Sequence, residues 1–215
     1  MWGGQPVWQD GGVEASEGLV AALERARRLG VLGPGPVVDH VAHAQGFVQA
    51  LAEVPEGALV VDLGSGGGVP GLIVAEARPD LRVLLLDAME KRTALLVEAV
   101  QSMGLADRVQ VQTGRAEVLG RDEELRGTAS AVTARSFGPP AATAECAAPL
   151  LSVGGILVVS EPPEDSNRWP ADPLSALGLV PRPRSIPGIQ ILEQTLPCPS
   201  TYPRRTGLPT KRPVF

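Results

Sequence analysis

Apolar residues follow two kinds of spacing along the chain. Short, mostly apolar runs of the kind that form buried strands occupy residues 58–63, 82–87, 108–112, 129–134 and 156–160. Apolar residues that recur every three or four positions predict helices at residues 14–29, 37–54 and 90–103. Strands that alternate with helices predict a doubly wound α/β fold, with a parallel sheet covered on both faces.

The pattern changes after residue 160. A Pro-rich polar loop leads into two further predicted strands, at residues 179–185 and 190–196. Residues 197–215 contain so many prolines that we expect neither a helix nor a central strand there. A chain of 215 residues suits one domain. We expect a single domain over 1–215, made of an N-terminal helical extension (1–54), an α/β core (55–196) and a Pro-rich basic tail (197–215).

Composition narrows the class of protein. The chain is 44% hydrophobic and 20% charged, which is ordinary for a globular domain. No run approaches the roughly 18 apolar residues of a membrane span, and the N-terminus lacks the basic start and apolar core of a secretory signal. Two cysteines and two histidines lack the spacing of a zinc site. We therefore expect a cytoplasmic monomer that binds neither a membrane nor a metal.

The net charge of −5 is unevenly distributed. The segment from Arg182 to the C-terminus has six basic residues and one acidic residue, so it carries +5 and the remainder carries −10. Such a tail is either a solvated surface or a contact for phosphate groups, and charge alone does not decide between them.

The sequence "VVDLGSGGGVPG" (60–71) begins in the first predicted strand and ends in a cluster of glycines. Glycine costs backbone entropy, so we interpret the cluster as bare backbone against which a ligand lies, beyond the carboxyl end of the strand. Pro70 is expected in the first turn of the next helix, whose free N–H groups would face the same ligand.

Two ligand classes fit these glycines. Gly66, Gly68 and Gly71 satisfy the G-x-G-x-x-G pattern of dinucleotide sites. Asp62, followed by glycines at 64, 66 and 68, also fits an acidic residue before G-x-G-x-G. A carboxylate at position 62 would repel a pyrophosphate and attract an ammonium or sulfonium group. Because Asp87 lies about 20 residues further on, where it could accept ribose hydroxyls, the residues favour S-adenosylmethionine.

Several segments together resemble one family. In chain order they are "DLGSGGGVPGL", "LLLDAMEKRTALLVEAV", "TGRAE", "VTARSFGP", "PLLSVGG" and "YPRRTGLPTKRP". They resemble the guanine-N7 methyltransferases of bacterial small-subunit (16S) ribosomal RNA, also called glucose-inhibited division protein B. The resemblance extends from about residue 37 to the C-terminus. Its glycine loop is common to all methyltransferases of this fold, whereas the combination with "KR", "GRAE" and "TAR" is far more specific.

The resemblance implies a class I S-adenosylmethionine-dependent methyltransferase that acts on 16S ribosomal RNA or the small ribosomal subunit. Its sheet would have seven strands, the last one antiparallel. The candidate cofactor contacts are Asp62, Gly64, Gly66, Gly68, Val69, Asp87, Ala116, Glu117 and Arg135. Within this set, the resemblance assigns the methionine part to Gly64, Gly66 and Val69, the ribose to Asp87, and the adenine to Ala116 and Glu117.

Arg135 of "TAR" would face the cofactor and the target base, and it is the candidate catalytic residue. The candidate RNA contacts are His40, Lys91, Arg92, Arg204, Arg205, Lys211 and Arg212. Attack by guanine N7 needs no prior removal of a proton, so catalysis would consist chiefly of positioning the base.

The chain departs from the family pattern at two places. A Lys-Gly pair after the fifth strand is replaced by "VVSEPPE", which puts Glu161 near that position, and an Asp-Ser pair after the histidine is replaced by "HVAHAQG". Both departures fall on the expected RNA side. They leave open a small-molecule methyltransferase of the same fold and an inactive cofactor- or RNA-binding homologue. A nicotinamide-dependent dehydrogenase also fits the glycines, but Asp62 argues against it.

Overall fold

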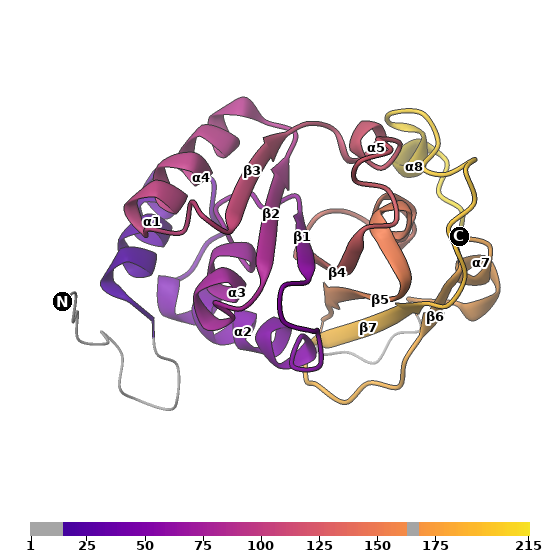
Figure 1. Cartoon of the computed structure of the whole chain (residues 1–215), viewed down its shortest axis with the longest axis horizontal. Coiled ribbons are helices and arrows are strands. Elements are labelled where there is room, and N and C mark those ends of the chain that lie inside the picture. Colours follow the sequence, from indigo (N-terminus) through magenta and orange to yellow (C-terminus); the bar gives the residue numbers. More distant parts are fainter. Residues whose placement is uncertain (1–14, 163–167) are drawn as a thin grey trace.

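Seven strands form one sheet in the computed structural model, which describes residues 15–162 and 168–215 (Figure 1). The sheet order is β3-β2-β1-β4-β5-β7-β6. The strands are β1 (Leu59–Leu63), β2 (Arg82–Asp87), β3 (Val109–Thr113), β4 (Ala129–Ala134), β5 (Leu151–Ser160), β6 (Leu179–Pro181) and β7 (Ile189–Gln194). Strands β1 to β5 pair in parallel, and β7 is antiparallel to both β5 and β6. The predicted α/β fold with an antiparallel last strand is confirmed.

Helices cover both faces of the sheet (Figure 1). One face is packed by α1 (Glu17–Arg28), α2 (Val37–Ala50), α3 (Gly71–Ala77) and α4 (Glu90–Ser102). The other is packed by α5 (Ala116–Leu119), α6 (Pro140–Ala147), the 3₁₀ turn Ala148–Leu150 and α7 (Ala171–Ser175), and α8 (Leu208–Lys211) contacts α6. Among the described helices, none is long and apolar enough to cross a bilayer.

Capping, charge and apolar spacing all favour helix α1 at this place in the chain. The Ser16 hydroxyl accepts the Leu19 N–H at 3.1 Å and caps the first turn, while three arginines occupy the last turn, where the helix dipole favours cations. The buried Leu19, Leu23 and Ala26 recur at helical spacing on the side of α1 that packs against the neighbouring helices α2, α3 and α4. The predicted start of this helix at residue 14 and part of the predicted loop after residue 160 lie outside the described residues.

Three expectations about the elements were wrong in part. Strand β5 begins at Leu151, five residues before the expected start, because Gly154 and Gly155 let it pass through an irregularity in its pairing with β4. Strand β6 ends at Pro181, four residues before the expected end. The Arg182 N–H still donates to the Ile191 carbonyl at 2.9 Å, but Pro183 then has no N–H for the ladder. The tail, expected to contain no helix, forms the single turn α8. Pro209 lies in that first turn, where its missing N–H is not needed.

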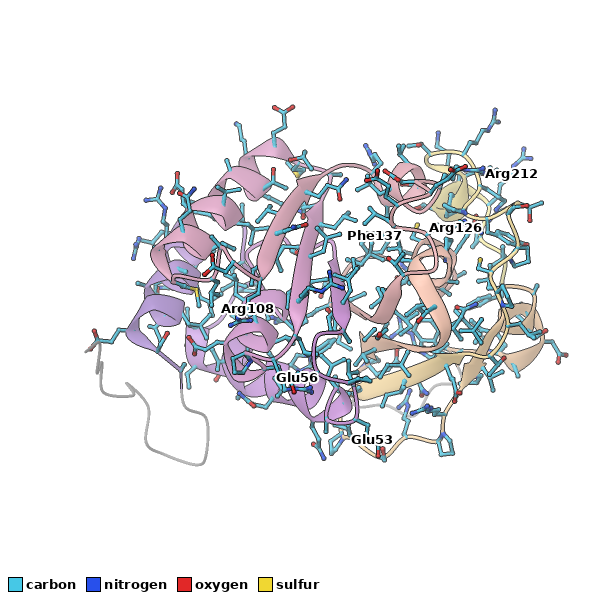
Figure 2. All side chains as sticks on the ribbon, in the orientation of Figure 1. Glu53, Glu56, Arg108, Arg126, Phe137 and Arg212 are labelled. Carbon is cyan, nitrogen blue, oxygen red and sulfur yellow. The ribbon has the colours of Figure 1, made fainter. Side chains whose placement is uncertain are left out.

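The tail is fixed to the domain by two arginine side chains. Arg126 donates through both terminal nitrogens to four backbone carbonyls at 2.8–2.9 Å, three of which belong to tail residues 198, 199 and 202. Arg126 and Arg212 lie at the same corner of the molecule in Figure 2. Arg204 binds Glu145 of α6 through Nε at 2.9 Å, Nη2 at 2.6 Å and its backbone N–H at 2.8 Å. Arg204, expected as an RNA contact, therefore has a structural role.

We predict that Arg204→Ala destabilises the protein. Glu145 is 0% exposed, and it would remain as an unpaired buried charge. Removing one partner of a buried pair costs roughly 3–5 kcal/mol, and we expect the lower end because the Arg204 side chain is 26% exposed. The free energy of unfolding, measured with denaturant, tests this.

Arg205→Ala is the matched control, because Arg205 is exposed and its side chain makes no hydrogen bond or ion pair with the described residues. It should change stability by no more than about 0.5 kcal/mol. Equal, small effects of the two substitutions would contradict the anchoring role of Arg204.

Candidate functional site

The loop after β1 is held at its side by the end of β2. The Gly64 N–H donates to the Leu86 carbonyl at 2.8 Å. Asp87 Oδ2 accepts the Gly66 N–H at 2.9 Å, and its Oδ1 accepts the Met89 N–H at 2.9 Å. Asp87 therefore fixes the glycine loop and the entry to α4 at the same time.

Asp62 holds the loop from beneath and is 1% exposed. Its Oδ2 accepts the Gly71 N–H at 3.1 Å, and its Oδ1 accepts the Thr133 hydroxyl at 2.8 Å. Burial raises the pKa of Asp62 to about 6, although these hydrogen bonds oppose the rise. The first N–H of α3, expected to face a ligand, is thus bound by Asp62. Contact between Asp62 and a cofactor stays a prediction.

The glycines of this loop serve two different needs. A Cβ atom on Gly68 or Gly71 would lie 2.4 or 2.3 Å from leucine side chains of the core, so these two glycines make room for the protein itself. A Cβ atom on Gly64 would instead lie 2.7 Å from the ring of Phe137, and the φ angle of Gly64 is +73°. Gly64 is the loop glycine whose backbone borders a cavity.

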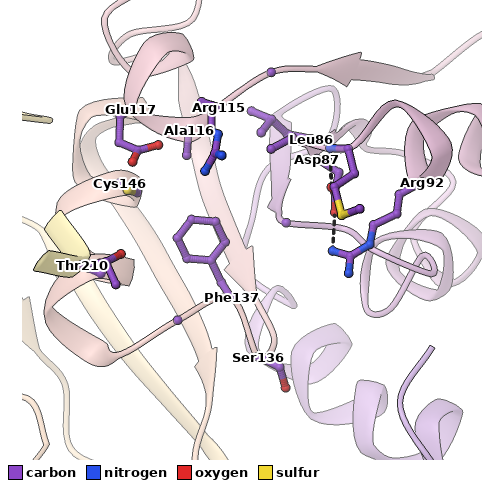
Figure 3. A pocket seen from close by; sticks show the side chains of 16 residues that line it. Leu86, Asp87, Arg92, Arg115, Ala116, Glu117, Ser136, Phe137, Cys146 and Thr210 are labelled. Carbon is purple, nitrogen blue, oxygen red and sulfur yellow. Dashed lines mark hydrogen bonds and ion pairs between the residues drawn. The ribbon is translucent and has the colours of Figure 1, made fainter. Parts of the chain in front are cut away.

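That cavity, here called the glycine-loop pocket, has a volume of about 250 Å³ (Figure 3). It lies at the carboxyl ends of the parallel strands, where open α/β sheets bind their ligands. The expected cofactor contacts that line it are Gly64, Asp87, Ala116 and Glu117. The remaining expected contacts, which lie outside its lining, are Asp62, Gly66, Gly68, Val69 and Arg135.

Asp87 and Arg92 line one wall of the pocket and provide hydrogen-bond acceptors and donors that suit a diol. A carboxylate has about four lone-pair positions, and Asp87 uses two of them for backbone N–H groups. Arg92 Nη1 lies 3.5 Å from Asp87 Oδ2, and the buried Arg92 Nε has no acceptor among the described residues. Vicinal hydroxyls, such as those of a ribose, could donate to the carboxylate and accept from this nitrogen.

Phe137 stands across the pocket from Asp87 and Arg92, with its ring against Gly64 (Figure 3). It follows Ser136, whose φ angle of 57° is strained for a residue other than glycine. A ligand that lies along Gly64 therefore requires this ring to move aside. Sequence reasoning missed Phe137, although its position two residues after "TAR" pointed to this edge of the sheet.

Arg135 is held by His40 of α2. Arg135 Nη2 lies 2.6 Å from His40 Nδ1, and His40 Nε2 lies 3.1 Å from the Gly33 carbonyl. Because a guanidinium only donates, Nδ1 is the acceptor and Nε2 carries the proton that it donates to Gly33. His40 is 5% exposed with both ring nitrogens bonded, so it positions Arg135 and does not form part of the surface. Burial lowers the pKa of Arg135, and Asp62 opposes this effect.

The tail closes the side of the pocket near α5. Glu117 Oε1 accepts the Gly207 N–H at 2.8 Å, and Thr210 of α8 lines the pocket. The expected RNA contacts whose side chains are exposed are Lys91, Arg205, Lys211 and Arg212. Sequence reasoning missed Gly207 and Thr210 as parts of the site, because their contacts connect positions about 90 residues apart.

The pocket has no reactive thiol. Cys146 lines it, but burial raises the pKa of this thiol, and the nearby Glu117 and Glu145 raise it further, so the sulfur stays protonated. Within the ranges 15–162 and 168–215, no group of three or more His, Cys, Asp or Glu side chains could hold a metal ion.

Comparison with known proteins places the chain in a family. A family model described as rRNA small subunit methyltransferase G matches residues 37–167. A relative from Deinococcus radiodurans, named Ribosomal RNA small subunit methyltransferase G, is 36% identical over 185 residues, which cover 79% of this chain and 73% of the relative. One from Moorella thermoacetica, of the same name, is 33% identical over 173 residues, covering 75% and 72%.

Among solved structures, the antibiotic-resistance methyltransferase Kmr aligns with a TM-score of 0.52 and 21% identity, over 75% of this chain and 94% of that chain. At this identity the likeness shows the fold alone. The family model and the relatives carry the assignment: this chain belongs to the rRNA small subunit methyltransferase G family.

Proposed function

We propose that this protein transfers the methyl group of S-adenosylmethionine to N7 of a guanine in 16S ribosomal RNA. The observation that carries the proposal is the glycine-loop pocket, in which Asp87 and the bare backbone of Gly64 lie side by side in a chain of this family. When bound, S-adenosylmethionine supplies an electrophilic methyl group.

Each part of the cofactor has a candidate partner in the pocket. Asp87 and Arg92 would hold the ribose, and Gly64 would border the methionine part. Ala116 and Glu117 would border the adenine. Four further residues expected as contacts would act by shaping the loop or its support, namely Asp62, Gly66, Gly68 and Val69.

The pocket suits a reaction that needs no general base. Guanine N7 has an in-plane lone pair, so the protein has only to align the base with the methyl group. The carboxylates that line the pocket, Asp87 and Glu117, already accept backbone N–H groups, and Cys146 is a protonated thiol. Neither of the two histidines of the chain lines the pocket. Arg135, held by His40, is the candidate for orienting the acceptor.

The proposed substrate is the small ribosomal subunit or its RNA, and exposed cations flank the pocket on two sides. Lys91 precedes the pocket residue Arg92, and Lys211 follows the pocket residue Thr210. Cytoplasmic location and a monomeric state remain predictions that accompany this substrate.

We predict that Asp87→Ala weakens binding of S-adenosylmethionine by about 1–3 kcal/mol, the range for hydrogen bonds to a charged group, or roughly 5- to 150-fold in Kd. Asp87→Asn should be milder. It still loses one backbone bond, because both carboxylate oxygens accept N–H groups. Isothermal titration measures both.

Glu90→Gln is the control, since it removes an exposed carboxylate three residues away. Unfolding curves establish that each variant is folded. If the two Asp87 variants bind the cofactor like the parent protein, the ribose assignment is wrong.

We predict that the protein methylates small subunits purified from a strain that lacks the modification, and that nucleoside analysis finds 7-methylguanosine in the 16S RNA. Arg135→Ala should reduce kcat at saturating subunits while leaving the Kd of S-adenosylmethionine within about twofold, because Arg135 lies outside the lining of the pocket. Cofactor binding without transfer to RNA would favour a small-molecule acceptor. Absence of cofactor binding would indicate an inactive homologue.

A further inference from the structure

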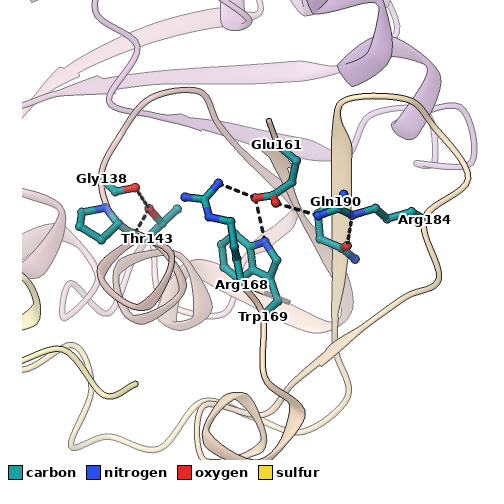
Figure 4. A network of polar contacts seen from close by, with 8 residues as sticks. Gly138, Thr143, Glu161, Arg168, Trp169, Arg184 and Gln190 are labelled. Carbon is teal, nitrogen blue, oxygen red and sulfur yellow. Dashed lines mark hydrogen bonds and ion pairs between the residues drawn. The ribbon is translucent and has the colours of Figure 1, made fainter. Parts of the chain in front are cut away.

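A buried carboxylate at the end of β5 organises two arginines and a tryptophan (Figure 4). The Glu161 side chain is 1% exposed. It pairs with Arg168 Nη1 at 3.2 Å and with Arg184 Nη2 at 2.8 Å, and it accepts the Trp169 indole N–H at 2.9 Å. A buried carboxylate needs such partners, because an unpaired buried charge costs several kcal/mol. The carboxylate of Glu161 thus lies between two guanidinium groups.

This cluster borders a small cavity beside the glycine-loop pocket. The cavity has a volume of about 30 Å³, and we call it the β5 cavity. Glu161, Arg168 and Trp169 form one side, and residues 136–138 form another. The same residues 136–138 line the glycine-loop pocket, so the two cavities share a wall at the carboxyl edge of β4 and β5. The β5 cavity has room for a water molecule or one oxygen of a larger group, and it is too small for a base.

Arg168 is the member of the cluster whose guanidinium has N–H donors that bind no described residue. Its side chain is 35% exposed, and Nη1 is its one nitrogen that bonds to a described residue. A guanidinium has five N–H donors in a planar fork, so the outer donors of Arg168 can meet two oxygens of one anion. Arg184, by contrast, is also bonded to Gln190 Oε1 at 3.2 Å. Glu161 therefore fixes one edge of the Arg168 guanidinium and leaves the other edge for a ligand.

We propose that Arg168 binds a backbone phosphate of the RNA acceptor next to the target nucleotide, and that Glu161 is its positioning residue. The inference rests on the proposed function, because it assumes an RNA acceptor. A phosphate diester carries the charge and the two oxygens that an arginine fork recognises. The whole chain has a net charge of −5, which repels RNA. A fixed cation beside the pocket supplies a local attraction that the overall charge does not.

The test compares Arg168→Gln with the parent protein in RNA affinity across a salt series and in the KM for small subunits. Glutamine keeps a donor for Glu161, which also retains Arg184, so the variant is expected to fold. Losing one phosphate contact should lower the log–log salt slope by about 0.7–0.9 and raise the KM several-fold. The Kd of S-adenosylmethionine should be unchanged. Arg168→Lys should restore the slope but only part of the KM, because lysine lacks the fork.

Arg182→Ala is the matched control. Arg182 follows the edge strand β6, pairs with Glu193 at 3.1 Å and lines neither of the two cavities. It should leave the slope and the KM as in the parent. If the parent methylates 16S RNA and Arg168→Gln has the salt slope and the KM of the parent, Arg168 does not bind the phosphate, while the proposed function stands. A parent that binds the cofactor but neither binds nor methylates the RNA overturns the proposed function and the inference together.

Discussion

The glycine loop after β1 depends on two buried carboxylates. A loop made mostly of glycine has few side chains with which to hold its own shape, so its backbone N–H groups must find partners outside it. Asp62 binds the Gly71 N–H from beneath, and Asp87 binds the Gly66 N–H from the side. Each buried N–H left without an acceptor would cost about 1–3 kcal/mol. Because Asp87 also lines the pocket, the shape of the loop and its ligand chemistry are coupled through one side chain.

The basic residues of this acidic chain are largely occupied by the fold. Arg204 is bound to Glu145, Arg126 holds the carbonyls of the tail, and Arg135 is bonded to His40. The bonds of Arg204 and Arg126 hold the tail at the side of the pocket, where α8 contributes Thr210 to its lining. The cations available to a polyanion are therefore few, and their positions count for more than their number. A few cations beside the pocket can attract RNA locally although the whole protein has a net charge of −5.

Sequence patterns predicted the sheet well and the pocket in part. The bounds of β2 and β4 agree with the apolar runs, because buried parallel strands are apolar on both faces. Asp87 could be assigned to the site from its distance along the chain to the glycines. The role of Gly68 in the cofactor site stays a prediction. Its packing role could not be predicted, since a sequence shows a missing side chain but not the leucine that lies in its place. Neither the contact of the Phe137 ring with Gly64 nor the bond between Glu117 and Gly207 could be predicted, because both depend on tertiary packing.

We propose that the glycine loop and Asp87 together form the cofactor site, and a crystal structure with S-adenosylhomocysteine is the decisive measurement. We expect the ribose on Asp87, the amino-acid part along Gly64, the Phe137 ring moved off that glycine, and the bond from Gly66 N–H to Asp87 preserved. A ligand bound elsewhere, or a loop that releases the Asp87 bond to admit it, would overturn this assignment.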